Sequence, residues 1–250
     1  MVIDRLAGLP DDTSVTPNPA RMYDYILGGV HNTEADRIAA EQARAALPDM
    51  HLIFRANRAF LRRAVLYLAT QGIDQFLDVG SGIPTVGNVH EIAHNVNEDA
   101  RVVYVDVDPV AVQFSAAILR DNAQATVIQA DARDPASILG HPETRRLLDL
   151  DRPVALLLVS MLMFVPDDTE ATGLVRAFRD ALAPGSYLMP AVGRQARDAL
   201  LGKRDRVSRD HALDPTALAV CRRRTGYAKS PPIRLKGRRR GLMHSRTDAT

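Results

Sequence analysis

The chain is best interpreted outward from residues 75–84, which read Gln75-Phe76-Leu77-Asp78-Val79-Gly80-Ser81-Gly82-Ile83-Pro84. A short apolar run with one acid leads into two glycines that are separated by a single residue. This pattern is typical of a buried strand that enters a tight turn. The glycines let the chain turn sharply and leave backbone N–H groups open to a ligand. Residues 86–95 can begin a helix, so strand, turn and helix together predict a nucleotide-binding pocket.

The details of this loop narrow the choice of nucleotide. Thr85 stands where a dinucleotide fingerprint has its third glycine or alanine, which disfavours NAD and FAD. Asp78 precedes the first glycine, where a carboxylate would repel a pyrophosphate but could pair with a cationic amino group. S-adenosylmethionine carries such an amino group and no phosphate, so the loop favours it as the cofactor. An ordinary turn without a ligand stays an alternative, because Gly-x-Gly alone is a weak motif.

The composition is that of a globular protein with enough apolar residues for a core. Its 250 residues fit one α/β domain. The single cysteine, Cys221, excludes a disulfide framework and a cysteine zinc site, and no metal site is predicted. No signal peptide is evident, and the longest apolar run, residues 154–165, is shorter than the roughly 18 residues of a membrane span. We therefore expect a cytoplasmic protein without a membrane partner.

Charge is distributed very unevenly along the chain. Residues 1–193 contain 16 arginines, no lysine and 25 acidic residues, a net charge of −9. Residues 194–250 contain 16 basic residues, among them all three lysines, against five acids, a net charge of +11. Such a tail could bind nucleic acid. It has a single aromatic residue, Tyr227, and no regular pattern, so we disfavour that partner.

Helical patterns dominate the first seventy residues. Residues 1–19 are polar and contain three prolines, which predicts a mobile arm. Apolar residues at helical spacing predict three helices, over 20–27, 34–46 and 54–70. The first is expected to end at Gly28-Gly29, and Asn32 is expected to cap the second. These helices can form a lid whose tyrosines cover the glycine turn, or they can simply pack on a sheet with solvated arginines.

Strand and helix patterns alternate through the middle of the chain. Apolar and β-branched runs predict strands over 76–79, 101–106, 125–129, 154–159 and 186–189. Helices are expected after these strands, over 109–120, 135–139, 143–148 and 169–182. The alternation predicts an α/β fold with a Rossmann-like, doubly wound and mostly parallel sheet. Ligands bind such sheets beyond the carboxyl ends of the strands.

Acidic residues lie at or near the carboxyl ends of three of the predicted strands and should therefore meet at one edge of the sheet: Asp78, Asp106 and Asp131. Asp106 lies 24 residues after Gly82, near the offset at which an acid accepts hydrogen bonds from ribose hydroxyls. Asp108 could share that role, or it could be an exposed turn residue. We favour Asp106 for the ribose because it ends the strand directly.

Asp131 and Ser160 follow the third and fourth strands. Asp131 could accept a hydrogen bond from the adenine amino group; as alternatives it could cap a helix or pair with Arg133. The run Val159-Ser160-Met161 ends the fourth strand, and we expect the reacting methyl group to lie over it.

Several motifs between residues 17 and 188 can be compared with known families. They are Ala20-Arg21-Met22-Tyr23-Asp24-Tyr25-Ile26-Leu27-Gly28-Gly29, Asn57-Arg58-Ala59-Phe60-Leu61-Arg62-Arg63, the run 75–85, Val103-Tyr104-Val105-Asp106 with Asp108-Pro109, Ala130-Asp131 with Arg133-Asp134-Pro135, and Ala183-Pro184-Gly185-Ser186-Tyr187-Leu188. Together they resemble the actinobacterial S-adenosyl methyltransferase family once called DUF574, one of the Rossmann-like class I methyltransferases. The resemblance implies a seven-stranded sheet, an N-terminal helical lid and S-adenosyl-L-methionine as cofactor.

The resemblance maps the cofactor pocket of the family onto Gly80, Ser81, Gly82, Asp106 and Asp131, and onto Arg21 and Tyr23 of the lid. The full set of residues predicted to bind the cofactor adds five further residues: Arg58, Asp78, Val107, Ala132 and Ser160.

The chain departs from this family in two places. Met163 stands where the family has a histidine near the end of the fourth strand. After Leu188 the family continues with two more strands, whereas the basic segment shows no strand pattern. We therefore divide the chain into an N-terminal arm and helical lid (1–70), a Rossmann-like core that binds S-adenosylmethionine (71–193) and a basic, atypical tail (194–250).

For the tail we consider two explanations, disorder and a shifted reading frame. If the C-terminal strands are missing or altered, the fifth strand becomes an exposed edge with an uncovered apolar face. The chain could then be inactive despite an intact cofactor pocket. Translation of the genomic DNA in the other frames tests the second explanation, which requires a Phe-rich, strand-like ending in one of them.

The sequence predicts a methyltransferase that uses S-adenosylmethionine and acts on a small-molecule acceptor. The Asn/Asp-Pro-Pro-Tyr/Phe signature of enzymes that methylate nucleobases or glutamine amides is absent, and residues 160–163 read Ser-Met-Leu-Met. No catalytic base is identified, since His90, His94 and His141 qualify only by residue type. The alternatives are a non-catalytic binder of S-adenosylmethionine or a nucleoside, a nucleic-acid-associated protein with a basic tail, and an NAD-dependent dehydrogenase. The oligomeric state is not predicted.

Overall fold

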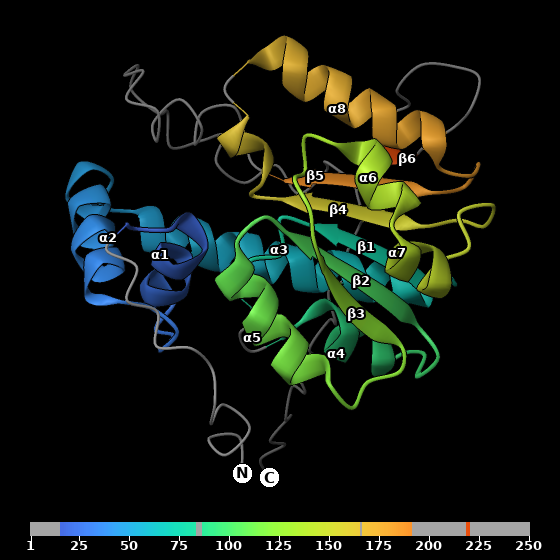
Figure 1. Cartoon of the computed structure of the whole chain (residues 1–250), viewed down its shortest axis with the longest axis horizontal. Coiled ribbons are helices and arrows are strands. Elements are labelled where there is room, and N and C mark those ends of the chain that lie inside the picture. The colour runs from blue at the N-terminus through green and yellow to red at the C-terminus, as the bar shows by residue number, and fades with distance from the viewer. Residues whose placement is uncertain (1–15, 84–86, 166, 192–218, 221–250) are drawn as a thin grey trace, which may run out of the picture.

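The computed structural model describes residues 16–83, 87–165, 167–191 and 219–220. These residues form a six-stranded sheet in the order β3-β2-β1-β4-β5-β6, flanked by helices (Figure 1). The strands are β1 (Gln75–Val79), β2 (Arg101–Asp106), β3 (Ala125–Gln129), β4 (Ala155–Val159), β5 (Tyr187–Ala191) and β6 (Ala219–Val220). The first five run parallel, and β6 is antiparallel to β5. The predicted α/β fold with a doubly wound, mostly parallel sheet is confirmed.

The strand order reverses between β1 and β4, which pair with each other in the middle of the sheet. On one side of this point the chain proceeds outward to β2 and β3, and on the other it proceeds to β5. Connections to opposite sides leave a crevice at the carboxyl ends of the two central strands, which is where such sheets bind ligands. The loop after β1 lies in that position.

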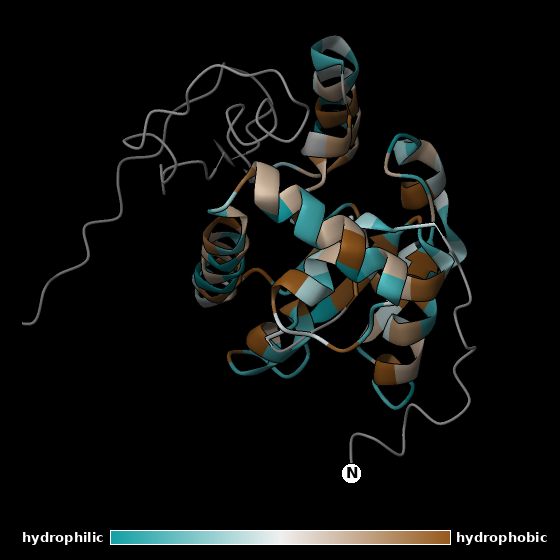
Figure 2. Cartoon of the chain, turned by 90° about the vertical axis from the view of Figure 1, so that its left-hand side faces the viewer, coloured by the Kyte–Doolittle hydropathy of each residue, from teal (hydrophilic) through white to brown (hydrophobic). Residues whose placement is uncertain are grey.

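Helices cover both faces of the sheet because its strands are apolar on both sides. One face is covered by α3 (Met50–Thr70), α4 (Val89–His94) and α5 (Pro109–Leu119), and the other by α6 (Pro135–Gly140), α7 (Pro142–Leu147) and α8 (Asp168–Ala181). Neighbouring residues of β1 enter opposite cores: Phe76 packs with α3 and α4, and Leu77 with α6 and α8. Hydrophobic and hydrophilic residues alternate along the helical ribbons, as expected for helices with one buried face (Figure 2).

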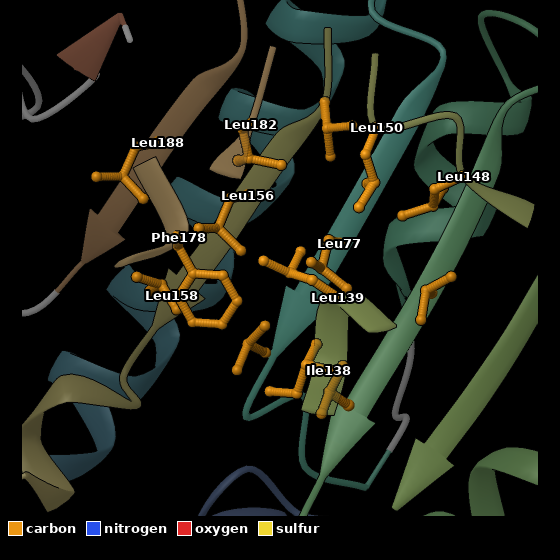
Figure 3. Close-up of a cluster of buried hydrophobic side chains, with 14 of the residues drawn as sticks. Leu77, Ile138, Leu139, Leu148, Leu150, Leu156, Leu158, Phe178, Leu182 and Leu188 are labelled. Atoms are coloured by element: carbon orange, nitrogen blue, oxygen red, sulfur yellow. The ribbon is translucent and has the colours of Figure 1, made fainter. Parts of the chain in front are cut away.

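The core under α8 is built from leucines of the central strands and one aromatic ring. Phe178 and Leu182 lie beside Leu156 and Leu158 of β4, with Ile138 of α6 nearby (Figure 3). All five side chains are buried. This packing holds the face of β4 that is turned toward α8. It therefore fixes the carboxyl end of β4 beside β1.

Polar caps set the starts of the helices that follow the strands. Asp108, Asp134 and Asp167 accept backbone hydrogen bonds at the starts of α5, α6 and α8, and proline is the first residue of α5 and of α6. The helix after the glycine loop begins at Val89, later than the predicted start at 86, because Asn88 forms a capping box with Glu91.

The N-terminal segment contains α1 (Pro19–Ile26) and α2 (Glu34–Ala46). Figure 1 shows both at the side of the sheet where β4 and β5 end. The predicted arm over 1–19 is wrong for its last residues, since Asn18 caps α1; residues 1–15 lie outside the described part. The predicted cap Asn32 is also wrong: Thr33 caps α2, and the Asn32 amide instead donates to Asp24 and to the Gly29 carbonyl.

The C-terminal expectations are met only in part. The exposed edge that we expect at the fifth strand if the last strands are missing is not observed, because Tyr187 and Leu188 of β5 pair with Val220 and Ala219 of β6. The implied seventh strand is not among the described residues, which form six. Apart from β6, the basic tail lies outside the described residues, so its disorder or shifted frame stays a prediction. Among the helices that the structure describes, none combines the length and the hydrophobicity of a membrane span.

Candidate active site

A cavity of about 440 Å³ lies between the carboxyl ends of the strands and helices α1 and α3. It is lined by 11 of the 12 residues predicted to bind the cofactor: Tyr23, Arg58, Asp78, Gly80, Ser81, Gly82, Asp106, Val107, Asp131, Ala132 and Ser160. Residues from α1, α3 and four strand ends thus converge on one space. Its volume is within the ~300–1,000 Å³ that is usual for small-molecule sites.

The glycine loop after β1 has the backbone shape that its sequence predicts. Gly80 and Gly82 have φ angles of 75° and 66°, in the left-handed region that favours glycine. The Gly80 and Ser81 N–H groups donate to the Val105 carbonyl at 2.8 and 3.1 Å, which ties the loop to β2. A Cβ atom on Gly80 would lie 2.6 Å from Cγ of Met161, so the loop also requires glycine on steric grounds. The Ser81 Oγ is buried without a hydrogen-bond partner among the described residues, and it is available to a polar ligand.

Asp78 lies near the end of the buried strand β1 and faces the cavity. Burial raises the pKa of its carboxyl group to about 7; the Arg58 guanidinium opposes this shift and the Asp106 carboxylate adds to it. Near neutral pH the group is therefore balanced between its neutral and charged forms. A cation placed beside it would favour the carboxylate.

Asp106 is held by the backbone of the glycine loop and of the next turn. Its Oδ2 accepts from the Gly82 N–H at 2.7 Å and its Oδ1 from the Asp108 N–H at 2.9 Å. Burial raises the pKa of this carboxyl group, while these backbone donors act in the opposite direction. Asp106 thus joins the ends of β1 and β2, and each of its oxygens keeps a second lone pair for a ligand.

Asp131 lies on the exposed rim of the cavity after β3, where it pairs with Arg133. The Arg133 Nε donates to both carboxylate oxygens at 3.0 Å, and this pairing lowers the pKa of Asp131. The alternative in which Asp131 is a partner of Arg133 is therefore realised. Any hydrogen bond to an adenine amino group must share the carboxylate with that guanidinium.

Arg21 is the one predicted cofactor residue that does not line the cavity. It is buried in the lid, where its Nε donates to Asp36 at 2.7 Å and its Nη2 to the Thr16 carbonyl at 2.9 Å. Burial alone would raise the pKa of Asp36, but hydrogen bonds, first of all from Arg21, lower it. The structure therefore gives Arg21 a place behind the cavity wall, where it joins α1 to α2.

The lid side of the cavity is formed by aromatic and amide side chains. The Tyr23 ring stacks on Phe54 with 4.2 Å between centroids, and the Tyr23 hydroxyl donates to the Phe54 carbonyl at 3.3 Å. The guanidinium carbon of Arg58 is 5.9 Å from the Tyr23 ring centroid. The Asn57 amide donates to the Ser160 Oγ at 2.8 Å, a bond between α3 and the end of β4. Ser160 has a φ of 61°, which is unusual for a residue with a side chain.

Sequence reasoning missed several lining residues, among them Phe54, Asn57 and Phe164. Phe54, Asn57, Arg58 and Leu61 recur at spacings of three and four and so share one face of α3. That periodicity could have identified the first two once Arg58 was placed in the site.

The three histidines considered as candidate bases do not line the cavity. The His90 ring is buried and contacts the Tyr104 hydroxyl at 2.8 Å, and the His94 ring contacts the Ala100 carbonyl at 2.9 Å. His141 caps α7 by accepting from the Glu143 N–H. Each of the three histidines therefore makes a structural contact outside the cavity.

Comparison with known proteins extends these observations to the whole chain. The sequence profile of a family described as S-adenosyl methyltransferase matches residues 10–218. The match runs beyond residue 193 into the basic segment and ends just before β6. No curated protein matches the chain.

Two solved structures are similar over most of their length. A methyltransferase candidate from Thermobifida fusca YX has 44% sequence identity and a TM-score of 0.72, over 78% of this chain and 75% of that one. A DUF574 family protein from Streptomyces avermitilis MA-4680 has 42% identity and a TM-score of 0.70, over 75% and 73% of the two chains. The resemblance read from the motifs is confirmed, and the chain belongs to the S-adenosyl methyltransferase family, whose members use S-adenosyl-L-methionine as methyl donor.

Proposed function

We propose that this chain transfers the methyl group of S-adenosylmethionine to a small-molecule acceptor bound in the cavity between the strand ends and the lid. The observation that carries the proposal is the convergence of Asp78, Ser81 and Asp106 on one cavity that has an aromatic wall on its other side. Family membership identifies S-adenosylmethionine as the methyl donor. The cavity is the reason to expect a small acceptor.

The residues present fit the donor. S-adenosylmethionine carries a sulfonium and an ammonium charge, and four carboxylates of the described chain line the cavity, from Asp78, Asp106, Asp108 and Asp131. We assign the ammonium group to Asp78, since a cation there relieves the cost of burying the carboxylate. The ribose is assigned to Asp106, and the adenine to the rim formed by Val107, Asp131 and Ala132. The Ser81 hydroxyl, buried without a partner in the described structure, fits the polar amino-acid end.

When bound, the sulfonium supplies an electrophilic methyl group, and the work left to the protein is mainly positioning. Phe54 and Leu61 of α3, together with Phe164 after β4, give the cavity an apolar surface that can exclude water from the reacting atoms. Asn57 and Ser160 place an amide and a hydroxyl among these apolar groups. We propose that this pair orients the nucleophilic atom of the acceptor, because a few polar groups placed in a largely apolar pocket fix the orientation of its ligand.

The test is titration calorimetry of the full chain with S-adenosylhomocysteine and, separately, with NADH. We expect binding of the first and none of the second. Turnover is then measured with methyl-labelled S-adenosylmethionine on pooled metabolite fractions and on nucleic acid. Failure to bind S-adenosylhomocysteine, or labelling of nucleic acid alone, would contradict the proposal.

A non-catalytic binder is the second candidate, favoured by one observation. The family histidine near the end of the fourth strand is Met163 here, and no histidine lines the cavity in the described part of the chain. Binding of S-adenosylhomocysteine without turnover on any fraction would favour it. In that case Met163→His, which restores the family residue, is the variant to assay for gained turnover.

A further inference from the structure

Asp106, the last residue of β2, and Asp108, two residues later, differ in what their carboxylates contact. Both oxygens of Asp106 accept backbone hydrogen bonds, from Gly82 and from Asp108. Asp108 uses only Oδ1, which accepts from the Val110 N–H at 3.0 Å and caps α5. Its Oδ2 is buried and has no hydrogen-bond partner among the described residues. A buried carboxylate oxygen without a donor costs free energy, so a ligand donor is expected beside it.

Asp108 is placed to meet a ligand. It lines the cavity together with Asp106, and its side chain is 6% exposed. Asp106 ends β2, and Asp108, two residues later, is the N-cap of α5. Two carboxylates that line one cavity and lie so close in the chain match a vicinal diol, which offers two hydroxyl donors on adjacent carbons.

A positive charge lies behind Asp108, on the lid. The Nη1 atom of Arg21 is 4.0 Å from Asp108 Oδ2, which is too long for a hydrogen bond but within the distance of an ion pair. Arg21 is held there by Asp36 and the Thr16 carbonyl. The guanidinium can therefore compensate the charge of Asp108 without occupying its acceptor.

We propose that Asp108 is a specificity-determining residue for the cofactor, whose ribose diol binds with one hydroxyl on Asp106 and the other on Asp108 Oδ2. Arg21 is then a positioning residue that holds Asp108 from the lid. This inference rests on the proposed use of S-adenosylmethionine. It also links the ribose to α1 and α2, because the chain of contacts runs from Asp108 through Arg21 to Asp36.

The test compares Asp108→Asn with the unaltered protein by calorimetry, using S-adenosylhomocysteine and its 2′-deoxy and 3′-deoxy analogues. Asparagine keeps a cap for α5 but removes the charge and the second acceptor. We expect Asp108→Asn to bind S-adenosylhomocysteine about 10- to 100-fold more weakly. The unaltered protein should bind one of the two deoxy analogues more weakly than S-adenosylhomocysteine, by about the factor that Asp108→Asn costs. Asp108→Asn should bind that analogue about as well as it binds S-adenosylhomocysteine. The inference would be overturned if both proteins bound S-adenosylhomocysteine equally well, or if both discriminated against the deoxy analogues to the same extent.

Asp134→Asn is the matched control, because Asp134 caps α6 in the same way and does not line the cavity. It should bind all three ligands as the unaltered protein does. The link to the lid has its own measurement: S-adenosylhomocysteine should slow hydrogen exchange over residues 19–46 in the unaltered protein and less so in Asp108→Asn. The same slowing in both would refute the role of Arg21. If the unaltered protein binds none of the ligands, the proposed function itself fails, an outcome distinct from both.

Discussion

The two halves of the cavity are held in place by different kinds of contact. In the strand-end half, backbone N–H groups make the bonds: Gly80 and Ser81 donate to Val105, and Gly82 donates to Asp106. In the lid half, side chains distant in sequence make them, as between Asn57 and Ser160, which are 103 residues apart. The first half is fixed once the sheet forms. The second depends on individual side chains and can therefore vary with the acceptor while the donor site stays the same.

This difference predicts where single substitutions act. Changes in the lid half should alter stability or acceptor recognition, and changes in the strand-end half should alter donor binding. The following experiments test that division.

Asp36→Asn should have the largest effect, on stability. Asp36 is fully buried and accepts from Arg21, from the Thr33 N–H and hydroxyl, and from the Asn18 N–H. Removing its charge leaves the buried Arg21 uncompensated on that side, so we expect a loss of about 3–5 kcal/mol in the free energy of unfolding, measured by urea denaturation.

Glu143→Gln is the control for that measurement. The Glu143–Arg146 pair is about half exposed, and exposed pairs contribute roughly 0–1 kcal/mol. A similar loss in both variants would show that the lid is not anchored by its buried ion pair.

Gly80→Ala should come next and should affect both stability and donor binding. Alanine at a positive φ costs roughly 1–2 kcal/mol. At Gly80 the added Cβ also meets Met161, so we expect a further loss of about 1–3 kcal/mol and weaker binding of S-adenosylhomocysteine.

Gly72→Ala isolates the backbone contribution. Gly72 has a φ of 87°, and beyond its chain neighbours no heavy atom of the described residues lies within 4 Å of the position that an added Cβ would take. Gly72→Ala should lose only the backbone cost of roughly 1–2 kcal/mol in the free energy of unfolding, and it should bind the donor normally. The second substitution Met161→Ala should restore part of the stability of Gly80→Ala. Equal losses at positions 72 and 80 would show that contact with Met161 is not what requires glycine in the loop.

Donor binding should depend on pH through Asp78. The carboxyl group has a raised pKa of about 7 in the free protein, and a bound ammonium group favours its charged form. Binding should therefore release a proton below about pH 7. The affinity for S-adenosylhomocysteine should fall with decreasing pH by at most about tenfold per unit and stay level above pH 7 until the ligand ammonium titrates.

Asp78→Asn should bind S-adenosylhomocysteine more weakly. Its affinity, measured by calorimetry, should not show this dependence on pH. Asp131 provides an internal comparison, because the neighbouring Arg133 lowers its pKa and it does not titrate in this range. A flat profile in the unaltered protein would remove Asp78 from the assigned ammonium site.

The same division explains how much the sequence could predict. The strands and the strand-end residues were predictable because local patterns determine them: apolar runs give strands, and parallel strands bring their ends together. Of the predicted cofactor residues that line the cavity, all but Tyr23 come from such ends or from α3, whose helical pattern is equally local.

The lid contacts were not predictable from local patterns. Arg21 was expected in the site because it belongs to a family motif, but its place depends on Asp36, which reaches it only when α1 and α2 pack together. Likewise nothing near Ser160 in sequence indicates Asn57. The pairing of β5 with β6 was missed for a similar reason, since a two-residue strand is too short to show a period.

The smallest expected effect concerns Ser160, and it separates two contributions at one residue. Ser160→Ala removes the hydroxyl that accepts from Asn57 but keeps a side chain at a φ of 61°. Ser160→Gly removes the same hydroxyl and also relieves the backbone, because glycine adopts this φ without strain. A neutral hydrogen bond contributes about 1 kcal/mol, and a side chain in this region costs about 1 kcal/mol. Ser160→Ala should therefore lose about 1 kcal/mol, and Ser160→Gly should stay close to the unaltered protein.

Ligand measurements on the same two variants test the boundary between the halves. Both should bind S-adenosylhomocysteine normally, and both should raise KM for the acceptor with little change in the affinity for the donor, because the shared loss is the Asn57–Ser160 pair. If donor affinity falls in both, Ser160 belongs to the strand-end half, and the acceptor must be oriented by other groups. If only Ser160→Ala differs from the unaltered protein, the strained backbone at the end of β4 matters more than the hydroxyl that it carries.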